Sequence, residues 1–221
     1  MALGWKHQGR VARDRWRRVR PLNLERMGNA WAAHRGYAQN QRGNHVPQTA
    51  WPLSLSIEPT TSCNLRCPEC PSGLRSFSRP TGMLDPALLE RALNEMGRYL
   101  VYLNLYFQGE PYLHPQLNEL VAMAHARGIY TSTSTNAHFL RPERCDAIVR
   151  SGLSRLIISI DGMTQETYSA YRVGGQLEKV LEGTRNMVEA RRKNRGRGPH
   201  LVWQFLVVGP NEHELTQIKR E

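Results

Sequence analysis

Three of the four cysteines lie close together on one short segment. Cys63, Cys67 and Cys70 are separated by three and then two residues. Three thiolates on one loop can bind a 4Fe–4S cluster and leave one of its irons without a protein ligand. A structural zinc ion would need a fourth ligand, usually from a second paired motif. We therefore expect a cluster, and a zinc or redox-sensing knuckle that uses Cys145 or a histidine is the alternative.

The remaining cysteine, Cys145, lies apart from the other three. It falls on a segment with a helical pattern that opens at Pro142. A free cysteine on a helix usually packs as a small apolar residue. We expect that role for Cys145.

Five segments have the patterns of β-strands. Leu53, Leu55 and Ile57 alternate with small polar residues, which is typical of a strand. Residues 156–160 are almost all apolar, as in a parallel strand that is buried on both faces. The five expected strands cover residues 53–57, 101–107, 129–135, 156–160 and 201–208.

Four segments with helical spacing alternate with these strands. The first opens at Asp85-Pro86, which suit the N-cap and first helical positions, and it ends at Gly97. The next two open at Pro115 and Pro142, and the fourth carries apolar residues between 177 and 188. Strands that alternate with helices predict an α/β fold with a parallel sheet and right-handed crossovers. Ligands bind such sheets at the C-terminal ends of the strands, so the loops after residues 57, 107, 135 and 160 should share one functional face.

Four motifs in and after those loops resemble the radical S-adenosylmethionine (radical SAM) enzymes. The cysteine spacing after the first strand resembles the family's signature, and residues 108–111, Gln-Gly-Glu-Pro, resemble its Gly-Gly-Glu-Pro motif with Gln in place of the first Gly. Residues 159–162 and 171–175 resemble the peptide- and protein-modifying branch, whose members carry a SPASM extension. The resemblance covers about residues 53–215. It implies a partial (β/α) barrel of parallel strands.

The resemblance also implies an activity. A 4Fe–4S cluster on Cys63, Cys67 and Cys70 would reductively cleave S-adenosylmethionine (SAM), and the resulting 5′-deoxyadenosyl radical would take a hydrogen atom from a substrate. For this branch the substrate would be a peptide or protein. The electron donor would be a protein such as flavodoxin or ferredoxin.

The same resemblance implies a set of SAM-binding residues. The 108–111 motif would bind the amino group of SAM, with the Glu110 carboxylate as an acceptor, and Ser159 with Arg172 would hold the carboxylate. A solvated carboxylate is the alternative for Glu110, and a surface salt bridge is the alternative for Arg172. Asn136 matches a family Asn beside the ribose, although Ala137 replaces the following Gly, and Asp161 either contacts the ribose or caps the next helix. The cofactor-binding residues are thus expected to be Gln108, Gly109, Glu110, Pro111, Asn136, Ser159, Asp161 and Arg172.

No residue stands out as a catalytic acid or base for a substrate. Five aromatic or imidazole side chains fall near the expected mouth of the site. We expect packed or hydrogen-bonded structural roles for all of them: Tyr106, Tyr112, His114, His138 and Tyr168.

The charge of the chain, +11 overall, is concentrated at its start. Residues 1–50 hold ten basic and two acidic residues, and residues 51–221 hold 20 and 17. We therefore divide the chain into a basic N-terminal extension (1–50) and a core (51–221). The extension is expected to be a solvated, partly helical tail, with docking to nucleic acid, an anionic surface or an acidic partner as the alternative. A second basic cluster, residues 191–199, is expected to end a helix and form an exposed loop.

The expected core holds five of the six strands that such barrels usually contain. We therefore expect it to be incomplete at its C-terminus and to lack the SPASM extension. Two other functions follow as alternatives: a truncated core that binds cluster and SAM as a partner subunit without independent turnover, and a zinc-knuckle protein that binds nucleic acid. The second would need base-stacking aromatic residues that the sequence does not show, so no specific nucleic-acid partner is expected. With no apolar run of membrane-spanning length and no secretory signal, a cytoplasmic location is expected.

Overall fold

The computed structural model describes residues 11–12, 14–44, 47 and 49–219. Its centre is a five-stranded sheet in the order β1-β2-β3-β4-β5. Each strand pairs in parallel with the one before it, which confirms the predicted α/β fold. The strands are β1 (Ser54–Ser56), β2 (Tyr102–Asn104), β3 (Tyr130–Thr135), β4 (Arg155–Ser159) and β5 (His200–Gln204).

Most of the strands are shorter than their patterns suggested. The predicted strand over residues 101–107, for example, is only three residues long. Its C-terminal part leaves the sheet and enters the loop that holds Gln108 and Gly109. The pattern of apolar residues continues beyond the hydrogen-bonded ladder because Leu105 is still fully buried in the core.

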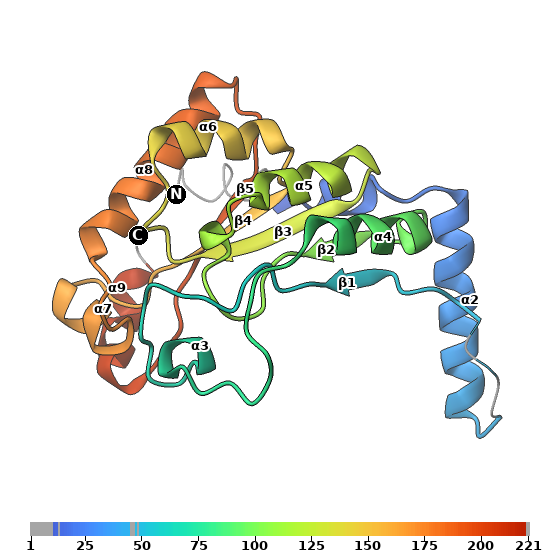
Figure 1. Cartoon of the computed structure of the whole chain (residues 1–221), viewed down its shortest axis with the longest axis horizontal. Coiled ribbons are helices and arrows are strands. Elements are labelled where there is room, and N and C mark those ends of the chain that lie inside the picture. The colour runs from blue at the N-terminus through green and yellow to red at the C-terminus, as the bar shows by residue number, and fades with distance from the viewer. Residues whose placement is uncertain (1–10, 13, 45–46, 48, 220–221) are drawn as a thin grey trace.

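Four longer helices cover one face of the sheet, as Figure 1 shows. Asp85 caps the first of them by accepting a hydrogen bond from the amide of Ala87 at 2.9 Å. Gly152 ends the third in the left-handed conformation, where glycine has no steric penalty. Together they bury the apolar side of the sheet, and all four predicted helices are confirmed: α4 (Pro86–Met96), α5 (Leu117–Ala126), α6 (Pro142–Ser151) and α8 (Leu177–Lys193).

Among the described residues, five short helical segments lie in the loops after the strands, and the sequence patterns did not reveal the first four of them. Segments of three to seven residues are too short to show a helical repeat. In Figure 1, α3, α7 and α9 gather at the end of the molecule toward which the strands point. The segments are α3 (Pro71–Leu74), η1 (Pro111–Leu113), α7 (Gln165–Tyr171), η2 (Gly209–Glu214) and α9 (Leu215–Ile218).

Helix α2 (Leu24–Gln41) lies at the opposite end, beside the start of the strands (Figure 1). Its Arg26 is buried and donates to five backbone carbonyl oxygens. Four of these acceptors belong to the residues that follow the C-terminal ends of α4 and α5, where helix carbonyls lack partners. They are Gly97 (3.1 Å), Arg98 (3.2 Å), Arg127 (2.9 Å) and Gly128 (3.1 Å), and the fifth is Pro21 (2.7 Å).

Asp14 is the second contact between this segment and the sheet. Its buried carboxylate accepts hydrogen bonds from the Tyr130 hydroxyl and the Arg155 guanidinium, at the starts of β3 and β4. The carboxylate also forms an ion pair with Arg18 at 3.3 Å. The expectation of a solvated tail is therefore wrong for these residues. The charges of Arg26 and Asp14 can be buried because each finds several partners on the body of the protein.

Asp14→Asn should loosen this docking. Burial raises the pKa of Asp14, but the hydrogen bonds from Tyr130 and Arg155 outweigh it and leave the pKa below its usual 3.8. Because the pKa of Asp14 is lower in the folded state than in the unfolded state, its ionised carboxylate stabilises the fold above about pH 3.8. This stabilisation is lost as the pH falls through the folded-state pKa. We expect Asp14→Asn to reduce the unfolding free energy by about 1–2 kcal/mol at neutral pH and to flatten its dependence on acid pH. Urea unfolding at several pH values measures both, and an unchanged acid profile would refute the assignment. Glu25→Gln, at an exposed ion pair, is the control.

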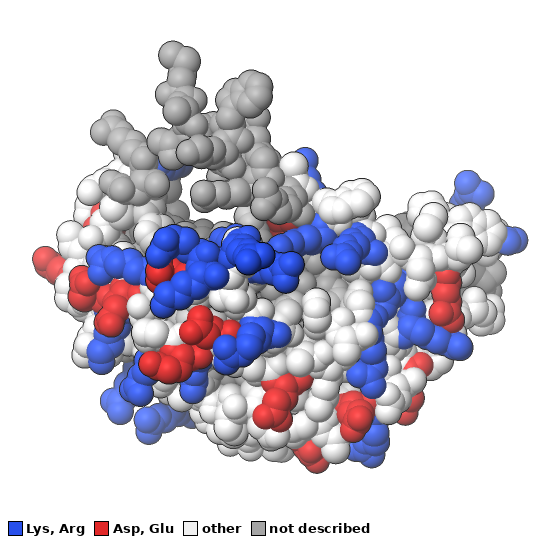
Figure 2. Space-filling model, turned by 90° about the horizontal axis from the view of Figure 1, so that it is seen from above, with Lys and Arg blue, Asp and Glu red and all other residues white. Residues whose placement is uncertain are grey.

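The surface of the outer helices carries both signs of charge. Figure 2 shows Lys and Arg side chains in a band across this face, with acidic side chains among them. On α8, Arg185 pairs with Glu178 and Arg192 with Glu189. The loop at 195–197 is exposed, as expected. Among the described residues, no helix has both the length and the apolar composition needed to cross a membrane.

Candidate functional site

The three clustered cysteines open onto one cavity at the C-terminal ends of the strands. Cys67 is buried, whereas Cys63 and Cys70 are partly exposed, and all three are free thiols. The cavity has a volume of about 270 Å³. Loops that follow β1, β2 and β3 contribute to its wall, as the parallel sheet predicted, and so do the ends of β4 and β5. Its other lining residues are Leu65, Gly73, Tyr106, Phe107, Gln108, Gly109, Glu110, Ser134, Thr135, Asn136, Ser159, Tyr171, Arg172 and Gln204.

Two glycines allow the backbone to pack closely around the cysteine loop. A Cβ atom on Gly73 of α3 would lie 2.5 Å from the carbonyl oxygen of Cys67. A Cβ atom on Gly109 would lie 2.3 Å from the carbonyl oxygen of Thr60. The amide of Glu110 then donates to the carbonyl of Ser62 at 2.8 Å. The loop after β2 is thus fastened directly to the residues that precede Cys63.

Gly109→Ala should distort this junction. Gly109 has a φ of +75°, where alanine is strained by about 1–2 kcal/mol, and the new methyl group would also meet rigid backbone. We expect a loss of at least about 2 kcal/mol of unfolding free energy and reduced binding of iron by the cysteine loop. Gly28→Ala on α2 is a matched control, because nothing lies within 4 Å of its Cβ position; it should gain up to about 1 kcal/mol. Wild-type stability and iron content in Gly109→Ala would contradict this account.

Glu110 is fully enclosed and does not lie in solvent. One carboxylate oxygen accepts from the amide of Tyr112 (3.1 Å) and the hydroxyl of Thr135 (2.7 Å), and the other accepts from the amide of Asn136 (2.7 Å). Burial raises the pKa of Glu110, and these hydrogen bonds act in the opposite direction. The alternative of a solvated loop carboxylate is therefore wrong. Glu110 joins the loops after β2 and β3.

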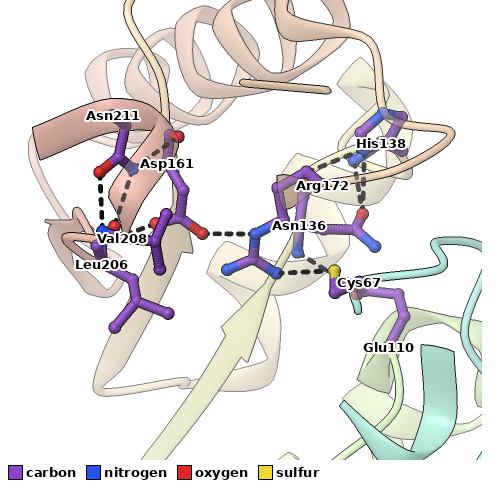
Figure 3. A network of polar contacts seen from close by, with 9 residues as sticks. All are labelled: Cys67, Glu110, Asn136, His138, Asp161, Arg172, Leu206, Val208 and Asn211. Carbon is purple, nitrogen blue, oxygen red and sulfur yellow. Dashed lines mark hydrogen bonds and ion pairs between the residues drawn. The ribbon is translucent and has the colours of Figure 1, made fainter. Parts of the chain in front are cut away.

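Asn136 connects the third loop to the cysteine loop. Its side-chain amide donates to the Asn64 side chain at 2.8 Å, between Cys63 and Cys67. Ala137, which follows it, has a φ of +64°, the conformation that a glycine would adopt more easily. The Asn136 oxygens also lie within hydrogen-bond distance of the His138 ring (Figure 3).

Arg172 and Asp161 form a buried ion pair beside Cys67, as Figure 3 shows. Arg172 Nε lies 2.5 Å from Asp161 Oδ2, and its Nη1 lies 4.0 Å from Cys67 Sγ. The two side chains are 19% and 0% exposed, so the alternative of a surface salt bridge is wrong. The alternative that Asp161 caps the next helix is also wrong, because Thr164 caps α7.

Six of the eight expected cofactor-binding residues line the cavity. Ser159 does so from the end of β4, across the ladder from Gln204. The exceptions are Pro111, buried as the first residue of η1, and Asp161, which lies behind Arg172. Their placement therefore favours support of neighbouring residues over direct contact with a ligand.

The histidines and tyrosines near the mouth mostly have structural partners. His114 Nε2 lies 2.8 Å from the carbonyl oxygen of Leu84, and His138 Nε2 accepts from the amide of Gln176 at 2.9 Å. Tyr112 and Tyr168 are buried in the core. Tyr106 is the member of the expected set that lines the cavity.

The donor set suits an iron–sulfur cluster. Burial raises the pKa of Cys63 to about 11 and also raises the pKa of Cys67, although Arg172 opposes the shift at Cys67. Metal binding to these thiols would therefore release protons, and the nearby guanidinium would offset thiolate charge. Within the described residues, no three His, Cys, Asp or Glu side chains are close enough to hold a single metal ion. Cys145 is fully buried in the core, as expected.

Several residues of the site were not found from the sequence. Gln204 and Tyr171 line the cavity, and Asn211 binds the segment around Asp161 from η2. Tyr171 falls inside a quoted motif, which was a usable signal. Gln204 and Asn211 carried no such signal, because their partners lie far away in the sequence. Gln204 pairs with Ser159, and Asn211 binds Asp161, which lies 50 residues before it.

Comparison with known proteins agrees with this geometry. The family model described as "Radical SAM superfamily" matches residues 57–220. The PqqA peptide cyclase of Gluconobacter oxydans is 32% identical over 169 residues, which cover 76% of this chain and 45% of that protein. The AdoMet-dependent heme synthase of Methanosarcina barkeri is 29% identical over 139 residues, which cover 62% of this chain and 40% of that protein. The chain thus spans less than half the length of these relatives.

A solved structure shares the fold. The crystal structure of Streptococcus suis SuiB bound to S-adenosylmethionine superposes with a TM-score of 0.59. The alignment has 18% sequence identity and covers 83% of this chain and 41% of that one. The five-stranded parallel sheet therefore matches an established partial barrel.

Proposed function

Since this chain belongs to the radical SAM superfamily, we propose that its cysteine cavity binds a 4Fe–4S cluster and SAM. The cluster would be held by Cys63, Cys67 and Cys70. Reductive cleavage of SAM, followed by hydrogen abstraction from a substrate, is the chemistry that these groups supply when bound. The observation that carries the proposal is that all three thiols face the same cavity as Gly109, Ser159 and Arg172.

The residues of this chain would bind and orient SAM. Arg172 offers a planar guanidinium for a carboxylate, and Ser159 adds a hydroxyl on the same cavity wall. Gln108 and Gly109 bring the backbone after β2 to the cavity wall. Glu110 holds the loops after β2 and β3 together and still has acceptor capacity for an ammonium group. Asn136 lies on the same wall and would contact the ribose.

The proposed substrate is a peptide or protein. The support is the likeness to a protein named as a peptide cyclase. An electron donor such as flavodoxin or ferredoxin would reduce the cluster. Free thiols and a reducible cluster suit a reducing compartment, so we place the protein in the cytoplasm.

Anaerobic reconstitution tests this proposal. The protein should take up about four irons and four sulfides per chain. After reduction with dithionite and addition of SAM, it should release 5′-deoxyadenosine and methionine, even if no substrate is present. Uptake of zinc in preference to iron, or a reconstituted cluster that leaves SAM intact, would contradict the proposal.

A further inference from the structure

A chain of hydrogen bonds connects the cysteine cavity to the segment after β5. Arg172 contacts Asp161 Oδ2 through Nε, and the other carboxylate oxygen of Asp161 accepts from the amide of Leu206 at 2.7 Å. Figure 3 shows this chain running from Cys67 through Arg172 and Asp161 to η2. The Arg172 guanidinium, which faces the cavity, is therefore bound by the Asp161 carboxylate, and this carboxylate is itself fixed by the Leu206 amide.

Asn211 fixes the far end of this chain. Its side-chain NH2 donates to the backbone oxygens of Asp161 and Leu206, both at 2.9 Å. Its side-chain oxygen accepts from the amide of Val208 at 2.8 Å. Asn211 is fully buried, and both of its donors and its acceptor are used. The three bonds hold the Asp161 backbone against the turn that supplies the Leu206 amide.

The same segment also anchors the helix that leads to Arg172. Glu214 is buried, and its carboxylate accepts from the amide of Met163 (2.8 Å) and the hydroxyl of Thr167 (2.7 Å), at the start of α7. Arg172 follows the last residue of α7. The segment 206–214 thus restrains Arg172 from two sides, through Asp161 and through α7.

We infer that Asn211 is a positioning residue for SAM: it fixes Asp161, which orients Arg172 toward the cavity. The inference rests on the proposed function, because it assigns the Arg172 guanidinium to the SAM carboxylate. None of the atoms of Asn211 lines the cavity. Its effect on SAM must therefore pass through Asp161 and Arg172.

A double-mutant cycle on SAM affinity tests the inference. Reconstituted Asn211→Ala should keep its iron, because the three cysteines are unchanged, but bind SAM about tenfold more weakly, as expected for one misaligned charge-assisted hydrogen bond. In an Arg172→Ala background the same substitution should have no further effect, because its route to SAM is already broken. Calorimetric titration of SAM measures all four affinities without relying on turnover.

Two further variants separate positioning from general damage. Asn186 lies on α8, and its partly buried side chain donates a hydrogen bond to the Leu140 carbonyl oxygen. Asn186→Ala removes this bond and should leave SAM affinity unchanged. Glu214→Gln is a milder change than Asn211→Ala and should weaken SAM binding in the same direction, which keeps the test open if Asn211→Ala does not fold. Wild-type affinity in both the Asn211 and Glu214 variants, or effects that add fully to that of Arg172→Ala, would overturn the inference alone. Failure of the wild-type protein to bind SAM would overturn the proposed function as well.

Discussion

Cys67→Ala is expected to abolish cluster assembly. Cys67 is the most buried of the three thiols and lies beside Arg172. The remaining cysteine, Cys145, lies in the core away from the cavity and cannot replace it. Iron should fall from about four per chain to near zero, because two thiolates alone do not hold a cubane cluster. Release of 5′-deoxyadenosine from SAM should then be undetectable. Chemical iron and sulfide analysis, with chromatography of the SAM products, measures both effects.

Cys145→Ala is the matched control for this experiment. Cys145 is fully buried in the hydrophobic core on α6 and does not line the cysteine cavity, so it is not placed to bind the cluster. Its loss should cost about 1 kcal/mol of stability through a small cavity and leave the iron content unchanged. If Cys145→Ala lost the iron while Cys67→Ala kept it, the assignment of the ligands would be wrong.

Arg26→Ala is expected to be the most destabilising single change in the N-terminal segment. It removes the donor for five backbone oxygens, and four of these follow the C-terminal ends of α4 and α5. The positive charge of Arg26 also interacts favourably with the partial negative charges at the C-terminal ends of α4 and α5. We expect the unfolding free energy to fall by about 3 kcal/mol, since buried acceptors are left without partners. Denaturant unfolding measures the loss.

Arg35→Ala tests whether charge alone explains that loss. Arg35 is exposed on the same helix, and its replacement by alanine removes the same formal charge. Its replacement should change stability by no more than about 0.5 kcal/mol. Equal effects at the two positions would show that the Arg26 hydrogen bonds contribute nothing specific. Arg26→Lys should recover only part of the stability, because a single ammonium cannot reach carbonyls on three segments.

The strands and the outer helices could be predicted because each has a local signal. Alternating or continuous apolar runs mark the strands, and Asp85-Pro86 and Gly152 mark helix ends through their own backbone preferences. Neighbouring strands in the sequence are also neighbours in the sheet, an arrangement that consecutive elements usually adopt. The short helices α3 and α7 lacked such a signal, since one or two turns have no repeat to detect.

The site could be predicted only where a motif names the residue. The three cysteines and six cavity residues fell in such motifs. The bonds from the Asn136 and Leu206 amides to Glu110 and Asp161 could not be found in this way, because the partners of a backbone amide leave no trace in the sequence. For the same reason Arg26 looked like one more charge in a basic run. Its role depends on carbonyl groups 71 to 102 residues away.

The docked N-terminal segment also dictates an order of assembly. During synthesis each strand can pair with the one already made. Arg26 must wait for Gly128, 102 residues later, and Asp14 must wait for Arg155, 141 residues later. Arg17 finds its acceptor, the Gly198 carbonyl, only after 181 residues. This segment leaves the ribosome before its partners are made and is therefore among the last to reach its final contacts. Closing such long loops makes this step slow relative to strand pairing.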